Sequence, residues 1–267
     1  MSPTDPAGPL RLNCEERGEG RPIVILHGLL GSVANWRGIA RTLSATWRVF
    51  SFDARNHGRS PHFALHDYPS MAADTAGMIE SLGIGPVVVL GHSMGGKTAM
   101  QLALDRPDLV SGLLVVDMAP RAYAIEGGPA DVVAALRRID LRAVMSRDEV
   151  DSLLASEVPD AATRSFALMN LYRGDDGFAW RCNLAGLAGS RADIAAAIDS
   201  DRVFAGPARF LRGAWSRYVT ESDEMRIREL FPAATIVTIA AAGHWLHVEA
   251  PASLVGEIQN FGRLMGR

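Results

Sequence analysis

The sequence has little of what indicates a disulfide-stabilised or metal-binding protein. Only two of its 267 residues are cysteines, Cys14 and Cys182, and they lie far apart in the chain. Neither has a second thiol or a histidine near it at the spacing of metal ligands, so we expect neither a disulfide framework nor a zinc site. No motif in the chain implies a metal ion or an organic cofactor.

An excess of basic charge and long apolar runs are also lacking. The formal net charge is −3, whereas binding to nucleic acid or to an anionic membrane requires a basic surface. No stretch approaches the roughly 18 apolar residues of a membrane span, and residues 1–9 contain no basic or apolar signal region. We therefore expect a cytoplasmic protein, a monomer or small homo-oligomer, whose partner is a small molecule rather than nucleic acid or a membrane.

The composition is that of a folded globular protein, with 48% apolar and 21% charged residues. Short apolar runs alternate with segments that have the period of amphipathic helices. Such runs are typical of parallel strands buried on both faces, and the helices between them suit crossover connections. We predict an α/β fold with a mostly parallel sheet flanked by helices. The predicted strands span residues 22–26, 47–52, 86–90, 113–116, 208–212 and 235–239, after an edge strand within 10–17, and the predicted helices include 71–82, 95–104 and 223–231.

The alternation stops between residues 121 and 203, where we find helical patterns and no strand. We predict one core domain, residues 1–120 and 204–267, interrupted by a helical cap at residues 121–203. The cap has more apolar residues than short helices need among themselves, and covering a pocket would use that surface. Alternatively, these apolar residues dock the helices onto the core domain. The helical patterns span 129–139, 148–155, 161–172 and 192–198.

The most informative motif is Gly91-His92-Ser93-Met94-Gly95, which lies between a predicted strand and a predicted helix. A strand, the pattern G-x-S-x-G and a helix form a nucleophile elbow, a tight turn that projects the serine hydroxyl. Side chains two residues before and after the serine would collide where strand and helix approach, and glycine at both positions avoids this. Ser93 is therefore the predicted nucleophile.

A serine hydroxyl needs a base to remove its proton, and histidine has a suitable pKa near neutrality. In hydrolases with this elbow the triad follows the order Ser, acid, His along the chain. That order leaves two of the seven histidines, His244 and His247. We predict His244 as the base, because it follows the last predicted strand, and His247 as a structural residue.

Asp117 is the predicted acid of this triad. It follows the strand at 113–116, from whose carboxyl end a carboxylate could reach the histidine and hold its tautomer. The loop after the strand at 208–212 is the usual place for the acid, but its first carboxylates, Glu221 and Asp223, come late. The alternative is that Asp117 caps the loop into the insertion.

An acyl-transfer site also needs backbone N–H donors for the oxyanion. Met94 would supply one and Leu29 the other, with Leu30 as the alternative to Leu29. Lys97, one turn into the helix after the elbow, is expected to form a structural salt bridge. Besides binding substrate, His27 and Asn56 could be buried residues that hold their loops in place. The candidate tryptophans could likewise be ordinary packing residues. The candidate substrate-binding residues are His27, Leu30, Asn56, His92, Trp180, Trp215 and Trp245.

Six segments resemble the α/β-hydrolase fold superfamily along nearly the whole chain: HGLLGS, DARNHGRS, GHSMGGK, VVDMAP, LRGAWSRYV and AGHWLHVE. The combination looks most like the small bacterial esterases of the YbfF type and their mitochondrial abhydrolase-domain relatives. The resemblance implies that GHSMGGK carries the nucleophile and GHW the base, and that the loop around Ser216 lacks the acid. It also implies a compact helical cap and activity on short or medium carboxylic esters, with acyl thioesters as a further class.

The predicted function is that of a serine carboxylesterase or acyl thioesterase that works through an acyl-enzyme. Serine at position 93 excludes the aspartate nucleophile of haloalkane dehalogenases and epoxide hydrolases. A C–C bond hydrolase and an elimination enzyme of menaquinone biosynthesis are the alternatives with the same elbow, because fold alone does not separate these reactions. A pseudohydrolase that binds a ligand without turnover is the alternative from another class.

Overall fold

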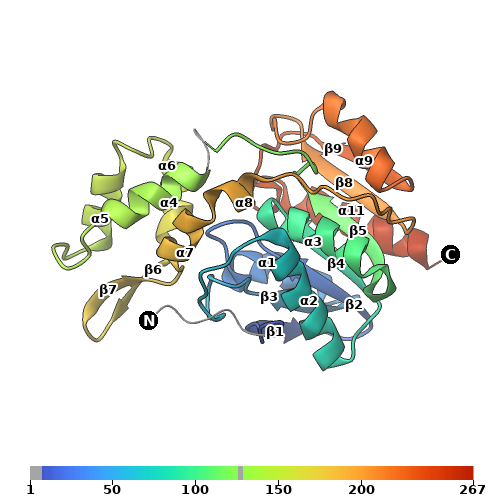
Figure 1. Cartoon of the computed structure of the whole chain (residues 1–267), viewed down its shortest axis with the longest axis horizontal. Helices are drawn as coiled ribbons and strands as arrows, with labels where there is room; N and C mark the ends of the chain where they lie inside the picture. The colour runs from blue at the N-terminus through green and yellow to red at the C-terminus, as the bar shows by residue number, and fades with distance from the viewer. Residues whose placement is uncertain (1–7, 126–128, 267) are drawn as a thin grey trace.

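The structure is a computed structural model that describes residues 8–125 and 129–266. Within these residues the core is a seven-stranded sheet in the order β1-β3-β2-β4-β5-β8-β9 (Figure 1). Neighbouring strands are parallel except for the antiparallel pair of β1 and β3. The predicted α/β class is confirmed. The strands are β1 (Cys14–Arg17), β2 (Arg21–Leu26), β3 (Trp47–Phe52), β4 (Val87–His92), β5 (Val110–Val116), β8 (Ala208–Gly213) and β9 (Ala234–Ile239).

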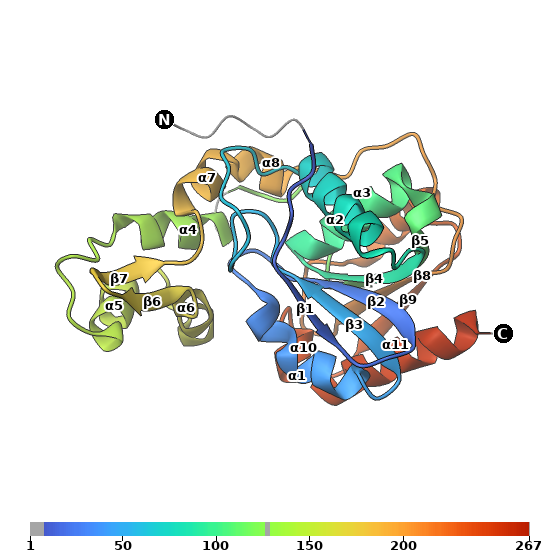
Figure 2. The ribbon, with the colours of Figure 1, turned by 90° about the horizontal axis from the view of Figure 1, so that it is seen from below.

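Helices cover both faces of this sheet (Figure 2). In β2, Ile23 and Ile25 belong to the apolar cluster of one face, whereas Val24 and Leu26 belong to the cluster of the other. This double burial explains why the inner strands are apolar without interruption. None of the helices in the described residues is long and apolar enough to cross a membrane. One face carries α1 (Val33–Leu43), α10 (Leu246–Glu249) and α11 (Pro251–Met265), and the other carries α2 (Tyr68–Leu82), α3 (Met94–Asp105) and α9 (Glu224–Leu230).

The segment between β5 and β8 lies to one side of the sheet (Figure 1). The prediction of a purely helical insertion is wrong for part of it, because the helix expected at 161–172 ends at Leu168 and a β-hairpin follows. Aromatic residues on both sides of an Asp-Asp turn are the hairpin signal in this sequence. The division into core and cap at residues 120 and 204 stays a prediction. The segment contains α4 (Pro129–Arg138), α5 (Arg147–Leu154), α6 (Ala161–Leu168), β6 (Leu171–Gly174), β7 (Gly177–Trp180), α7 (Leu184–Gly189) and α8 (Arg191–Ala195).

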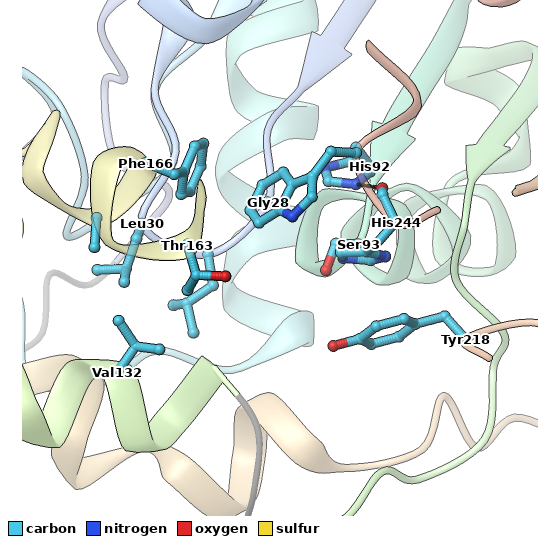
Figure 3. A pocket seen from close by; sticks show the side chains of 12 residues that line it. Gly28, Leu30, His92, Ser93, Val132, Thr163, Phe166, Tyr218 and His244 are labelled. Carbon is cyan, nitrogen blue, oxygen red and sulfur yellow. Dashed lines mark hydrogen bonds between the residues drawn. The ribbon is translucent and has the colours of Figure 1, made fainter. Parts of the chain in front are cut away.

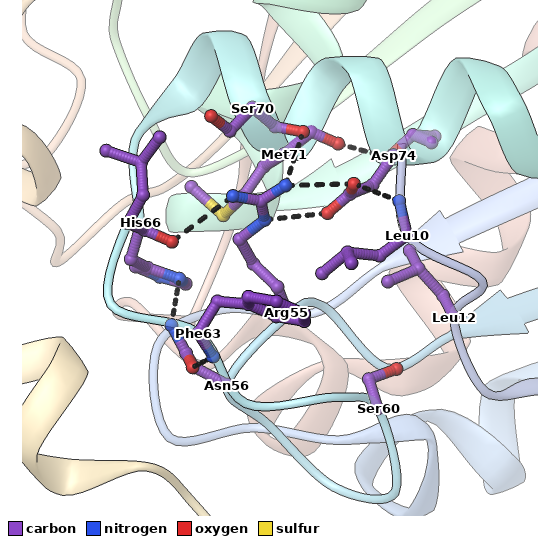
Figure 4. Close-up of polar contacts among 12 residues, drawn as sticks. Leu10, Leu12, Arg55, Asn56, Ser60, Phe63, His66, Ser70, Met71 and Asp74 are labelled. Atoms are coloured by element: carbon purple, nitrogen blue, oxygen red, sulfur yellow. Dashed lines mark hydrogen bonds and ion pairs between the residues drawn. The ribbon is translucent and has the colours of Figure 1, made fainter. Parts of the chain in front are cut away.

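A buried ion pair fastens the loop after β3 to α2 and to the start of the described chain (Figure 4). Arg55 Nε lies 2.7 Å from Asp74 Oδ2 and its Nη2 lies 2.9 Å from Oδ1. Leu10 N donates to Asp74 Oδ1 at 2.7 Å. The two side chains are only 5% and 1% exposed, so each charge depends on the other for its solvation.

Removing the charge of Asp74 is expected to destabilise the protein strongly. Asp74→Asn leaves the Arg55 guanidinium buried without a counter-charge, and breaking such a pair typically costs about 3–5 kcal/mol. Asp108→Asn is the matched control, because Asp108 pairs with Arg106 on the surface, where a pair is worth about 1 kcal/mol or less. Urea unfolding followed by tryptophan fluorescence measures both free energies, and equal losses would contradict the assignment.

Candidate active site

The turn between β4 and α3 places Ser93 at the carboxyl end of the sheet. Ser93 has φ 54° and ψ −120°, a conformation that costs free energy for a residue with a side chain. A Cβ on Gly91 would overlap the Gly95 carbonyl group, and a Cβ on Gly95 would overlap the carbonyl of Leu26. Glycine at both positions therefore allows the strand and the helix to meet closely enough to form the elbow.

His244 and Asp117 form a hydrogen-bonded pair next to this elbow. His244 Nδ1 lies 2.7 Å from Asp117 Oδ2, although the two residues are 127 positions apart. Asp117 is completely buried, and its carboxylate also accepts from Gly213 N at 3.0 Å and from the Ser216 hydroxyl. Because Nδ1–H donates to the carboxylate, Nε2 keeps the lone pair that a general base uses.

Glu221 and Asp223, the later carboxylates, have other positions. Asp223 pairs with Arg121 at 2.9 Å and accepts from Thr220 N, while Glu221 is exposed. The loop after β8 thus contributes donors to Asp117 and no acid of its own. The structure brings Ser93, His244 and Asp117 together as the sequence predicts.

Two backbone amides near Ser93 are candidate donors of an oxyanion site. Met94 N is the first amide of α3, and Leu29 N belongs to the turn after β2, where Gly31 N donates to Gly28 O at 2.9 Å. Neither Met94 N nor Leu29 N donates to another group in residues 8–125 and 129–266. Leu30 N, the alternative donor, is occupied, because it donates to His57 Nε2 at 3.1 Å. Leu29 is therefore the better candidate.

A cavity of about 280 Å³ opens above Ser93 (Figure 3). Figure 3 shows Ser93, His244 and Tyr218 on one side and Leu30 and side chains from α4 and α6 on the other. Tyr218 stacks on the His244 ring with centroids 3.9 Å apart and an angle of 22°. Burial raises the pKa of Tyr218, so its phenol stays neutral. The lining residues are Gly28, Leu29, Leu30, His92, Ser93, Val132, Thr163, Phe166, Ala167, Tyr218, His244 and Trp245.

A second cavity of about 60 Å³ also reaches Ser93. It shares Leu29, Ser93 and Tyr218 with the larger cavity, and it includes Met94 but not His244. Ser93 thus lies where two spaces of different size meet. The other lining residues of the smaller cavity are Tyr68, Met118, Tyr123, Ala124, Ile125, Arg191, Ile194 and Ala195.

Comparison with known proteins decides the family. Residues 21–251 match the family model described as alpha/beta hydrolase fold. The chain belongs to the α/β-hydrolase fold family. It is 39% identical over 245 residues to the sn-1-specific diacylglycerol lipase ABHD11 of Mus musculus, covering 90% of this chain and 80% of that protein. It is 30% identical over 242 residues to esterase YbfF of Escherichia coli, covering 90% of this chain and 92% of that protein.

A solved structure supports the same conclusion. The structure titled "Marine microorganism esterase" superimposes on this α/β hydrolase with a TM-score of 0.91 and 39% identity, covering 94% of this chain and 99% of the other. The predicted resemblance to the α/β-hydrolase superfamily, and to esterases of the YbfF type within it, is confirmed. The protein is an α/β hydrolase of the esterase and lipase type.

Four predicted substrate-binding residues of this α/β hydrolase lie outside the lining of both cavities. His27 is buried and accepts from Ala54 N at 3.0 Å, and burial lowers its pKa. Asn56 is completely buried and its Oδ1 accepts from Phe63 N at 2.8 Å. Both residues hold the loop after β3 in place rather than line a cavity.

Of the three candidate tryptophans, only Trp245 lines a cavity. Trp215 is 72% exposed, and Trp180 is at the end of β7 in the hairpin of the inserted segment, so neither reaches a cavity wall. Trp245 does line the larger cavity and contacts Phe166 of α6, with ring centroids 4.3 Å apart. His92 lines the same cavity but is 1% exposed, and its Nε2 lies 2.9 Å from His244 O. His92 therefore links the nucleophile turn to the histidine loop.

Sequence reasoning missed Thr163, Phe166 and Tyr218 as cavity residues. Helical periodicity predicts which face of a helix is apolar, but not which residues of that face lie above an opening. The loop that follows β8, at the carboxyl end of the sheet, has two aromatic residues, Trp215 and Tyr218, and its sequence does not show which of them faces the cavity.

The predicted salt bridge of Lys97 is wrong. Lys97 is completely buried, and no carboxylate pairs with it in the part of the chain that the structure describes. Its Nζ donates to Ala196 O and lies 5.4 Å and 4.7 Å from the ring centroids of Tyr68 and Tyr123. Burial, and to a lesser degree the charge of Arg121, lowers the pKa of Lys97 to about 7.

Replacement of Lys97 is expected to change how stability depends on pH. The pKa is about 7 in the folded protein against an ordinary value of 10.5, so between these values the unfolded chain binds more protons. The group therefore makes stability rise with pH in this interval. Lys97→Met, which keeps the volume, should flatten that rise in thermal unfolding midpoints measured from about pH 6.5 to about 10. Parallel curves for both proteins would contradict this.

Asp117→Asn is expected to reduce kcat by about a thousandfold or more, because the amide no longer holds the histidine in the required tautomer. Glu221→Gln is the control, since Glu221 is an exposed carboxylate of the loop after β8. Steady-state hydrolysis of a p-nitrophenyl ester compares the two variants. A larger loss in Glu221→Gln than in Asp117→Asn would sink the choice of acid.

Proposed function

We propose that this α/β hydrolase is a serine carboxylesterase that acts on acyl esters, with acyl thioesters as a further substrate class. The observation that carries the proposal is the convergence of Ser93, the His244–Asp117 pair and two unoccupied backbone amides on one cavity. The names esterase and lipase among relatives at 30–39% identity support the same class of bond.

The geometry supports the following reaction. His244 Nε2 takes the proton of the Ser93 hydroxyl as its oxygen attacks the acyl carbonyl carbon. The resulting oxyanion accepts hydrogen bonds from Leu29 N and Met94 N. The imidazolium then gives its proton to the leaving alcohol or thiol as that bond breaks. Water, activated by the same histidine, hydrolyses the acyl-enzyme and restores Ser93.

The two cavities distinguish the two halves of the substrate. The histidine that protonates the leaving group lines only the larger cavity, so the alcohol half belongs there. The smaller cavity lacks His244 but contains both oxyanion residues, Leu29 and Met94, and therefore suits the acyl chain. The larger cavity has a volume of about 280 Å³ and the smaller one about 60 Å³. We infer esters with a short acyl chain and a bulkier alcohol.

A panel of esters that varies the acyl and alcohol lengths independently tests both parts of the proposal. The kcat/KM is expected to fall steeply as the acyl chain lengthens and to change little as the alcohol lengthens. Ser93→Ala should lower kcat by at least about a thousandfold, because the nucleophile is lost. Undiminished turnover in that variant would refute the serine mechanism, and a preference for long acyl chains would reverse the assignment of the cavities.

A further inference from the structure

The turn that carries Leu29 has an unusual backbone conformation at Leu30. Leu29 and Leu30 are the central residues of a turn closed by the bond from Gly31 N to Gly28 O, 2.9 Å long. Leu30 has φ 60°, the left-handed conformation that glycine or asparagine normally provides at this position of a turn. For a leucine this conformation costs on the order of 1–2 kcal/mol, so contacts outside the turn must stabilise it.

Both backbone groups of Leu30 have such contacts. Its N–H donates to His57 Nε2 at 3.1 Å, and His57 is oriented by a 2.9 Å bond between Nδ1 and Arg55 O. Burial lowers the pKa of His57 well below its ordinary value, so Nε2 stays a neutral acceptor. The carbonyl oxygen of Leu30 accepts from Asn170 Nδ2 at 2.7 Å. The first contact comes from the core and the second from the inserted segment.

Asn170 is itself held in one orientation. It lies between α6 and β6 with 3% exposure, and its main-chain oxygen accepts from Arg181 N at 2.8 Å. The thiol of Cys182 lies 2.8 Å from Asn170 Oδ1. Burial raises the pKa of Cys182 far above neutrality, so the thiol is an S–H donor and Oδ1 is its acceptor. The other end of the amide, Nδ2, is thereby directed toward Leu30.

We propose that Asn170 is a positioning residue of the oxyanion site. Its amide holds the Leu30 carbonyl, and so keeps the turn at 28–31 in the shape that presents Leu29 N–H to the reacting carbonyl oxygen. The oxyanion site is then complete only when the hairpin side of the inserted segment is seated on the core. This inference rests on the proposed esterase function, because it concerns the same catalytic step.

A second asparagine provides a matched control. Asn183 also joins the inserted segment to the core, through bonds from Nδ2 to Asn56 Oδ1 at 3.0 Å and to Phe63 O at 3.1 Å. These two bonds end on the loop after β3, and unlike the bond from Asn170 neither of them reaches the turn that carries Leu29. A variant at Asn183 therefore reports the effect of loosening the inserted segment in general.

The test compares Asn170→Ala with Asn183→Ala on a short-chain p-nitrophenyl ester. Asn170→Ala is expected to lower kcat by about 10–100-fold with KM within about twofold, because oxyanion bonds act in the transition state. The rate at which a fluorophosphonate labels Ser93 should fall similarly, since phosphonylation places an oxygen in the same site. Asn183→Ala should lower the unfolding midpoint while kcat stays within about threefold.

Cys182 keeps the proposal testable if Asn170→Ala does not fold. Cys182→Ser retains a donor to Asn170 Oδ1, whereas Cys182→Ala loses it, so only the alanine variant should show a several-fold lower kcat. An unchanged kcat in Asn170→Ala or Cys182→Ala, or an equal loss in Asn183→Ala, would overturn the role of Asn170. A wild-type protein that neither hydrolyses esters nor reacts with the fluorophosphonate would instead overturn the proposed function, and this inference with it.

Discussion

The buried carboxylate of Asp117 is the interaction on which the arrangement of the site depends. A fully buried charge is tolerable only when hydrogen bonds replace its hydration, and here the partners come from Gly213, Ser216 and His244. Meeting that requirement draws together the carboxyl ends of β5, β8 and β9. His92 extends the linkage, because its ring connects the end of β4 to the main chain of His244. The hydrogen bonds that compensate the buried charge of Asp117 therefore also fix the position of His244 at the site.

The sequence was sufficient to propose the elbow, the histidine and the acid because each follows from a motif, a chain order or a strand end that can be read from the residues. Steric crowding requires glycine around Ser93, chain order leaves few histidines, and a strand end offers Asp117. The sheet was equally predictable, since strands buried on both faces must be apolar throughout. The elbow and the strands are constrained within a few residues or within one repeated pattern, whereas the histidine follows from the order of the triad along the chain.

What could not be predicted depends on contacts between distant segments. The partner of Lys97 is a backbone carbonyl about a hundred positions away, and no pattern marks a carbonyl in advance. Asn56 is a polar residue in a catalytic-end loop, but its partners, Phe63 and Asn183, make it a docking residue rather than a ligand-binding one. The hairpin of β6 and β7 was missed because two strands of four residues each carry little periodicity.

The burial of Lys97 has a practical consequence for chemical work on this protein. Because it is the chain's single lysine and has no exposed surface, the folded protein offers amine-reactive labels and crosslinkers no accessible lysine side chain. The amine donates to Ala196 O, so movement of the segment around Ala196 away from α3 would expose it. Acylation of this one residue, followed by mass spectrometry, would therefore report the opening of the inserted segment without any introduced probe.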